Sequence, residues 1–165
     1  PILPKNVTKA SDLILEILRQ GGYATTVARW NNGAWEEYVM RGKNKYGFDF
    51  DLEPGTGYFV RNHVDIDFIA YGQELKGDHI LKLRKGYNLV GITSSNKYTA
   101  VSLIDMATEK QKGKQLIKTV TTYDSGLLEP LVKEKGEVYG IDFPIEETRG
   151  YFIRVKDTMD LPLSN

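Results

Sequence analysis

Apolar residues at helical spacing predict two short helices. The first lies between residues 8 and 19, after a threonine and before Gly21-Gly22, which would end it. Its apolar residues fall on one face and are Leu13, Ile14, Ile17 and Leu18. A similar pattern predicts a second helix between residues 99 and 109.

Two turn sequences predict two antiparallel hairpins. Asn31-Asn-Gly33 and Asp124-Ser-Gly126 contain residues that tolerate positive φ, as two-residue hairpin turns require. The cross-strand pairs that follow from these turns are Trp30 with Trp35, Arg29 with Glu36, Val27 with Tyr38, Tyr123 with Leu128, and Val120 with Leu131.

Strict alternation of apolar and polar residues predicts a strand over residues 48–53, with a counterpart at 141–145. The residues expected to face a core are Phe48, Phe50, Leu52, Ile141, Phe143 and Ile145, whereas Asp49, Asp51 and Glu53 should face solvent. A turn then leads into another strand at Tyr58, and we assign Gly55 and Gly57 positive φ within this turn.

The chain is predicted to be an internal duplication. Residues 46–62 align without a gap on residues 139–155, and nine of the seventeen positions are identical. We therefore expect a first copy at residues 1–76 and a second at residues 77–165. The second copy opens with a strand, kink and strand over residues 80–92, whose counterpart would precede residue 1. The first sheet should then run one strand short or take a strand from another chain.

These elements predict an α+β fold that is mainly antiparallel β. Two-residue turns connect antiparallel neighbours, and a single helix per copy covers only one face of a sheet. Each of the two tandem copies is thus expected to be a β-α-β-hairpin-β-hairpin unit.

Composition narrows the functional classes. The 165 residues carry 22 Lys and Arg against 22 Asp and Glu, so no net field draws the chain to nucleic acid or to an anionic membrane. No apolar run approaches the roughly 18 residues of a membrane span, and we expect no signal peptide in this sequence. The absence of cysteine excludes disulfides and thiol catalysis.

Three segments together resemble a known family. They are Lys85-Gly-Tyr-Asn-Leu-Val-Gly-Ile92, Trp30-Asn-Asn-Gly-Ala-Trp35 and Leu52-Glu-Pro-Gly-Thr-Gly-Tyr-Phe-Val60. They are similar to the tandem "GWNLIGLP … LEPGxGYFV" module of large secreted and surface-layer-associated proteins of bacteria and archaea. Tyr87 stands where that pattern has tryptophan, and Glu147-Thr-Arg149 stands where it has Pro-Gly-x. The resemblance implies an extracellular or cell-surface location and a noncatalytic role.

Aromatic residues near the hairpin tips are the candidate ligand-binding residues. Trp30 and Trp35, with Tyr123 on the second hairpin, present rigid surfaces of the type that stacks on sugar rings. The alternative is that Trp30 and Trp35 form a packing pair without any ligand, and cross-strand aromatic pairs favour this interpretation.

Acidic residues offer a weak calcium candidate. Asp49, Asp51, Asp65 and Asp67 carry the oxygen ligands that Ca²⁺ takes, but their spacing is not that of a calcium loop, and a solvated acidic face explains them as well. The two histidines are not set at metal-ligand spacing, and no catalytic triad or phosphate-binding loop is present in the sequence.

We therefore expect no catalytic residues, no metal and no cofactor. The leading prediction is a noncatalytic structural or adhesion module of a cell-surface or secreted protein, with other domains or subunits of a surface assembly as partners. The alternative is a carbohydrate-binding module that uses the hairpin-tip aromatics, with a polysaccharide as partner. Strand exchange with another chain is a further expected interaction.

Overall fold

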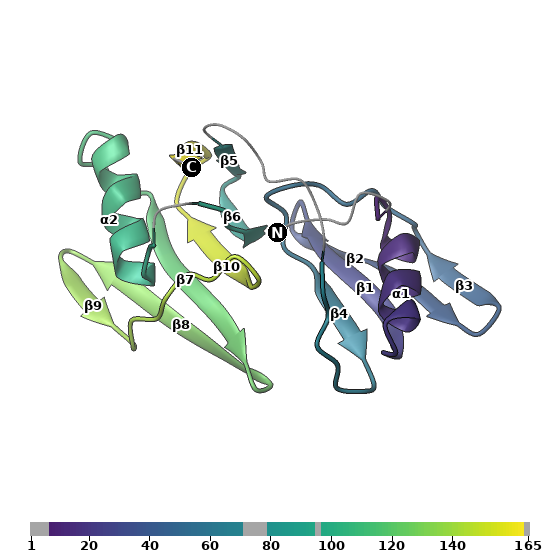
Figure 1. Ribbon diagram of the computed structural model, residues 1–165. Coiled ribbons are helices and arrows are strands. Elements are labelled where there is room, and N and C mark those ends of the chain that lie inside the picture. The colour runs from purple at the N-terminus through teal and green to yellow at the C-terminus, as the bar shows by residue number, and fades with distance from the viewer. Residues whose placement is uncertain (1–6, 71–78, 95–96, 164–165) are drawn as a thin grey trace.

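A computed structural model describes residues 7–70, 79–94 and 97–163, and shows a protein built mainly from antiparallel strands (Figure 1). Two helices complete the fold, and the predicted mainly antiparallel α+β class is confirmed. Neither of these helices, within the described ranges, is long and apolar enough to cross a membrane. The expected boundary between residues 76 and 77 lies outside the described residues. We call residues 7–70 the N-terminal half and residues 79–163 the C-terminal half.

The N-terminal half places one helix on a four-stranded antiparallel sheet of order β3-β2-β1-β4. Its elements are α1 (Ala10–Arg19), β1 (Ala24–Asn31), β2 (Ala34–Arg41), β3 (Asn44–Gly47) and β4 (Phe59–Asn62). The helix begins two residues after the predicted start and ends at the predicted residue.

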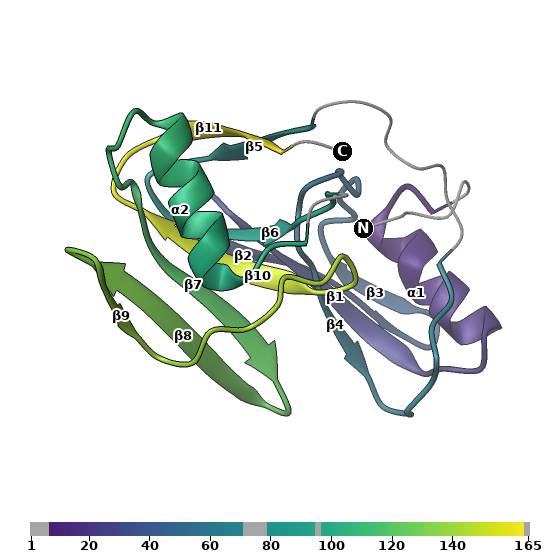
Figure 2. The ribbon, with the colours of Figure 1, turned by 60° about the vertical axis from the view of Figure 1, so that its left-hand side comes forward.

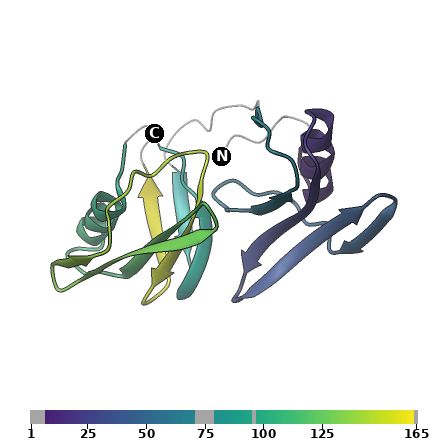
Figure 3. The same ribbon diagram turned by 90° about the horizontal axis from the view of Figure 1, so that it is seen from below.

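The C-terminal half has a five-stranded antiparallel sheet of order β6-β10-β7-β8-β9 and a two-stranded sheet of β11 and β5. Its elements are β5 (His79–Leu83), β6 (Gly86–Gly91), α2 (Ala100–Lys110), β7 (Ile117–Asp124), β8 (Leu127–Glu134), β9 (Glu137–Tyr139), β10 (Gly150–Val155) and β11 (Met159–Leu163). The predicted strand, kink and strand are β5 and β6. Figures 2 and 3 show the two halves side by side, with β6 and β10 on the side that faces the N-terminal half.

The predicted hairpin register is confirmed. Trp30 lies opposite Trp35 on β1 and β2, and Tyr123 lies opposite Leu128 on β7 and β8. In the first turn Asn32 has φ 50° and Gly33 has φ 87°, and the second turn repeats this pair of positive values. Positive φ at both central residues matches the twist of the flanking strands, so the turn chemistry determines which side chains face each other.

Each helix buries an apolar face against the sheet of its own half. The buried residues of α1 are Ala10, Leu13, Ile14 and Ile17, and those of α2 are Ala100, Leu103, Ile104 and Ala107. Helices of this length are marginal in water, so this packing supplies most of their stability. The buried side chains form two separate cores, one in each half.

The predicted strand over residues 48–53 is wrong, as is its counterpart at 141–145. Both segments are loops, and each makes only an isolated bridge beside the start of a helix. Phe50 is fully buried as expected, but Phe48 is 67% exposed and Ile141 is 86% exposed. Alternation therefore predicted the inward residues only in part.

The backbone of these loops pairs with the N-termini of the helices, which explains the difference. The N–H of Ala10 donates to the carbonyl of Phe50 (3.0 Å), and the N–H of Ala100 donates to the carbonyl of Phe143 (2.9 Å). The first N–H groups of a helix have no partner within it, so a neighbouring loop that supplies acceptors is stabilising. The hydrogen bonds that these loops make with the helix N-termini therefore outweigh the tendency of their alternating sequences to form strands.

Candidate functional site

Five aromatic side chains meet where the two halves of the molecule touch. We call this group the aromatic cluster; its members are Trp30 on β1, Trp35 on β2, Phe59 on β4, Tyr123 on β7 and Phe152 on β10. The centroids of Trp30 and Trp35 are 5.2 Å apart, those of Trp35 and Phe59 5.6 Å, and those of Phe59 and Tyr123 5.3 Å. Phe152 lies 6.0 Å from both Trp35 and Phe59. The structure thus brings together Trp30, Trp35 and Tyr123, the three candidate ligand-binding residues.

The hairpin register positions the tryptophans. Trp30 and Trp35 lie directly opposite each other on neighbouring strands. Phe59 on β4 lies opposite Ala28, which is two residues before Trp30 on β1 and therefore on the same face of the sheet. The ring planes of the two tryptophans are inclined at 76°. This edge-to-face arrangement is the favoured geometry for aromatic pairs and forms no flat shared platform.

The three candidate residues differ in what they leave accessible. The indole N–H of Trp30 donates to the carbonyl of Tyr87 on β6 (3.0 Å), so its polar edge is already used between the halves. Trp35 is 46% exposed and Tyr123 is 48% exposed. Beside Trp35, hydrogen bonds from Asn31 and then Arg29 lower the pKa of the Glu36 carboxyl, which stays charged near the cluster. Trp35 and Tyr123 are therefore the candidate residues with accessible surface for a ligand.

A second contact between the halves is made by the backbone of the loop after Leu52. The N–H of Gly57 donates to the carbonyl of Leu89 (3.1 Å), and the N–H of Gly91 donates to the carbonyl of Gly55 (3.1 Å). Gly55 has the expected positive φ of 79°. The positive φ predicted for Gly57 is wrong. Glycine is needed there because an added Cβ would lie 2.9 Å from Leu89 Cγ. Gly57 is required for the close approach of the loop to β6.

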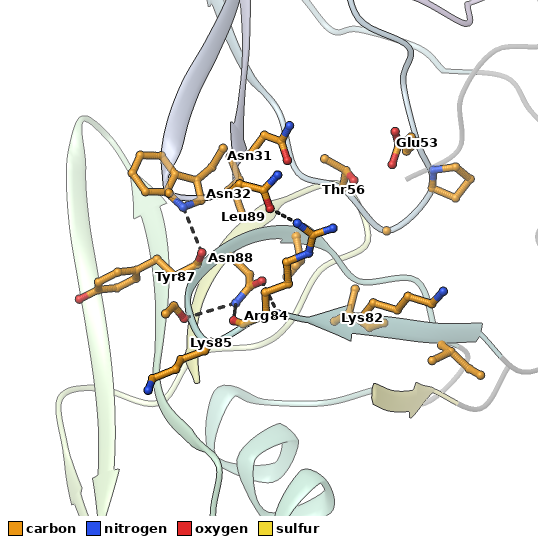
Figure 4. Close-up of a pocket in the computed structure, with 18 residues that line it drawn as sticks. Asn31, Asn32, Glu53, Thr56, Lys82, Arg84, Lys85, Tyr87, Asn88 and Leu89 are labelled. Atoms are coloured by element: carbon orange, nitrogen blue, oxygen red, sulfur yellow. Dashed lines mark hydrogen bonds between the residues drawn. The ribbon is translucent and has the colours of Figure 1, made fainter. Parts of the chain in front are cut away.

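A cavity of about 680 Å³ opens beside these contacts (Figure 4). The tip of the β1–β2 hairpin, the loop after Leu52 and strands β5 and β6 line it. Its charged lining residues are Glu53, Lys82, Arg84 and Lys85. The Arg84 guanidinium donates to the Asn32 side chain, which joins the two halves across the cavity. The Asn88 amide donates to the carbonyl of Arg84 (2.8 Å) and holds the kink between β5 and β6.

The chemistry of this cavity suits the binding of a polar ligand. It offers three cations, side-chain amides and the apolar part of the Trp30 indole, with one carboxylate. Hydroxyl-rich ligands take hydrogen bonds from such groups and stack on the neighbouring aromatic rings. Its described lining residues include one carboxylate, that of Glu53, and no histidine or serine.

The structure does not bring the calcium candidates together. The Asp49 carboxylate accepts from the N–H of Ser11 (2.9 Å) and from its hydroxyl (2.7 Å), so it binds the N-terminus of α1. Asp51 forms an ion pair with Lys9 (2.8 Å). Asp65 and Asp67 lie after β4. Among the described residues, no group of three or more His, Asp or Glu side chains is arranged to hold a metal.

Phe59 and Phe152 are the cluster members that the sequence did not single out. Both occupy the same place in the matched Gly-Tyr-Phe-x-Arg segments, 93 residues apart. The neighbouring Tyr58 and Tyr151 point the other way, into the two cores. Neighbouring side chains of a strand point to opposite faces, so a buried tyrosine indicates that the phenylalanine after it faces away from the core. This alternation could have identified both phenylalanines from the sequence.

The chain matches no protein-family model, and comparison with curated proteins and with solved structures returns no significant match. The protein is therefore described by its structural class and not by a family. It is a mainly antiparallel β protein whose four-stranded and five-stranded sheets meet at an aromatic cluster.

Proposed function

We propose that the chain consists of two tandem copies of one β-rich unit, at residues 1–76 and 77–165, and acts as a noncatalytic structural module of a cell-surface or secreted protein. In this role it spaces, anchors or presents other domains or subunits of a surface assembly. The location follows from the resemblance to surface-layer-associated modules described above.

Matching hydrogen bonds support the two-copy arrangement. The N–H of Glu53 donates to the Tyr58 hydroxyl (2.7 Å), and the N–H of Glu146 donates to the Tyr151 hydroxyl (2.8 Å). Burial raises the pKa of both phenols, so they stay neutral at all physiological pH values. Glu53 and Glu146 are 93 positions apart, as are Tyr58 and Tyr151, which is the offset of the sequence alignment.

The helix caps also correspond. Asp49 accepts from the N–H of Ser11, and Asp142 accepts from the N–H of Val101 (3.0 Å). A carboxylate at this position satisfies a free donor and complements the positive end of the helix dipole. The presence of the same long-range contact in both halves supports the proposal that they arose from one duplicated unit.

The aromatic cluster is the observation that carries the structural role. Phe152 of the C-terminal half touches Trp30 (6.5 Å), Trp35 and Phe59 of the N-terminal half. Each aromatic pair adds about 0.5–1.5 kcal/mol beyond the area that it buries. Together with the backbone bonds to β6, these contacts favour one rigid body, which a spacer needs.

Replacement of Phe152 by alanine is expected to loosen the two halves without unfolding either. Its ring contacts both tryptophans and Phe59 of the N-terminal half, more members of the aromatic cluster than Tyr123 contacts across the same boundary. We expect ¹⁵N relaxation to give one rotational correlation time for the native chain and two shorter ones for Phe152→Ala. The matched control is Tyr139→Ala, which removes a 59% exposed ring of the same half outside the cluster.

Two results would contradict this proposal. Independent tumbling of the halves in the native chain would exclude a rigid spacer. Turnover of a polysaccharide, peptide or ester substrate by the purified chain would exclude a noncatalytic role.

The second candidate function is carbohydrate binding, which the half-exposed rings of Trp35 and Tyr123 favour. We expect a glycan ligand to change tryptophan fluorescence, and Trp35→Ala and Tyr123→Ala each to weaken binding about tenfold or more, because stacked rings supply much of such affinity. Tyr46→Ala removes a 57% exposed ring outside the cluster and should leave binding unchanged. Unchanged fluorescence across a broad set of polysaccharides would exclude this function.

A further inference from the structure

We infer that the N-terminal half is a strand acceptor, which binds an extended strand, glycine kink and strand that residues 7–70 do not themselves contain. The donor has the chemistry of β5 and β6 of this protein: alternating apolar residues, several cations and a central glycine. The inference rests on the two-copy part of the proposed function. It does not depend on the location of the protein or on its role as a spacer.

The first observation is an open sheet edge at β4. In the C-terminal half, β10 lies between β7 and β6. Strand β4 matches β10 in the sequence alignment, but it has β1 on one side and no described strand on the other. Ile153 of β10 is fully buried, whereas the matching Val60 of β4 is 38% exposed. Unpaired backbone groups along such an edge are a template for another strand.

The second observation is an open segment after β4. Strand β11 pairs with β5 and buries Leu161 completely. The matching segment is residues 66–70, which forms no strand with any described residue, and its Phe68 is 37% exposed. Within the described part of the chain, its backbone is held only at Ile69, whose N–H and carbonyl bind the Gln20 side chain (2.9 and 2.8 Å). In the N-terminal half, no described strand therefore fills either of the positions that β5 and β6 fill in the C-terminal half.

An apolar groove joins these two edges. It has a volume of about 530 Å³ and lies between α1, β4 and residues 66–70, with Leu13, Ile17, Tyr58, Val60, Ile66 and Phe68 among its lining residues. Gly91 and residues 147–150 of the C-terminal half form its other wall. In the C-terminal half, the core against α2 instead contains the donor-type side chains of Leu81, Leu83, Val90 and Ile92. The groove thus has the location and the polarity of the site that β5 and β6 occupy.

Charge complementarity identifies a basic donor. In the C-terminal half, Lys82 of β5 lies opposite Asp160 of β11. The residue that matches Asp160 is Asp67, with Asp65 two positions earlier, and neither forms an ion pair with a described residue. The segment of residues 79–92 carries two lysines and one arginine and no acidic residue. The same register places the lysine of a donor opposite Asp67.

A labelled synthetic peptide with the sequence of residues 79–92 tests this inference on the whole chain. Fluorescence anisotropy is expected to show saturable binding, with NMR shift changes in β4 and in residues 66–70. Val60→Lys should weaken binding about tenfold or more, because it places a charge in the groove. Val138→Lys changes a 41% exposed valine on β9, at the edge of the other sheet, and should leave the affinity unchanged. Circular dichroism verifies that both variants fold.

Peptide variants keep the test independent of protein folding. A peptide with proline in place of the residue equivalent to Asn88 lacks a backbone donor and should lose binding. Asp67→Lys should weaken binding of the parent peptide by about three- to tenfold. A peptide with glutamate in place of the lysine equivalent to Lys82 should restore binding to this variant.

Three results would overturn the inference: no saturable binding up to about 1 mM peptide, equal losses in Val60→Lys and Val138→Lys, or shift changes confined to the C-terminal half, where the peptide would have displaced β6. The relaxation measurement on the native chain reports rigidity whether or not the peptide binds. Failure of the strand-acceptor inference and failure of the spacer proposal are therefore distinguishable.

Discussion

Replacement of Phe50 by alanine is expected to lower the free energy of unfolding of the N-terminal half by about 3–5 kcal/mol. The Phe50 side chain is fully buried and stacks on Tyr58, with ring centroids 6.1 Å apart. The guanidinium of Arg29 lies 4.5 Å from the ring centroid on the Phe50 face. Removal of the ring leaves a cavity in a core of few side chains and also takes away the surface on which the cation rests.

Urea unfolding followed by tryptophan fluorescence measures this effect, because Trp30 and Trp35 both report on the N-terminal sheet. The matched control is Phe48→Ala, two residues away, where the ring is 67% exposed. We expect that variant to change the free energy of unfolding by less than about 0.5 kcal/mol. Equal losses for Phe48 and Phe50 would indicate that this segment forms the alternating strand that its sequence predicts.

Replacement of Gly47 by alanine is expected to cost about 2–3 kcal/mol and to detach β3 from β2. Gly47 has φ 80°, and an added Cβ would lie 2.0 Å from the carbonyl oxygen of Glu37. A side chain there meets both an unfavourable backbone conformation and a backbone atom that cannot move without breaking the sheet. Hydrogen exchange of the β3 amides, together with urea unfolding, measures the two consequences separately.

Gly42→Ala separates the two causes. Gly42 also has positive φ, at 58°, but an added Cβ would have no atom within 4 Å. We expect a loss of about 1 kcal/mol, which is the cost of the left-handed conformation alone. A loss as large as that of Gly47→Ala would show that the close approach to Glu37 is unimportant. Gly140, which corresponds to Gly47, would meet the carbonyl oxygen of Pro130 at 2.5 Å and should behave like Gly47.

The predicted site residues illustrate a general difficulty with aromatic residues. Trp30 and Trp35 were recognisable as a cross-strand pair, but the sequence left packing and ligand binding open as alternatives. In the structure Trp30 serves the contact between the halves, while Trp35 combines that contact with an accessible face. Stacking against a neighbour and stacking on a ligand use the same ring surface, so only the arrangement of neighbours can distinguish them.

Local features of this protein were determined by the sequence alone. The end of α1, the tight turn at Asn32-Gly33 and the pairing of Trp30 with Trp35 all depend on residues a few positions apart. Helical spacing and the positive φ of the turn residues are local properties of the backbone, so the printed sequence is sufficient to predict them.

Contacts between distant residues were decided only by the tertiary structure. Asp49 binds the start of α1 and Phe48 lies in solvent, because the free N–H groups of the helix attract the segment that alternation assigned to a strand. Phe59 and Phe152 meet across the two halves, and no described strand pairs with the outer edge of β4. Which backbone groups and ring faces remain without a partner is a property of the whole assembly of elements, and no local pattern contains it.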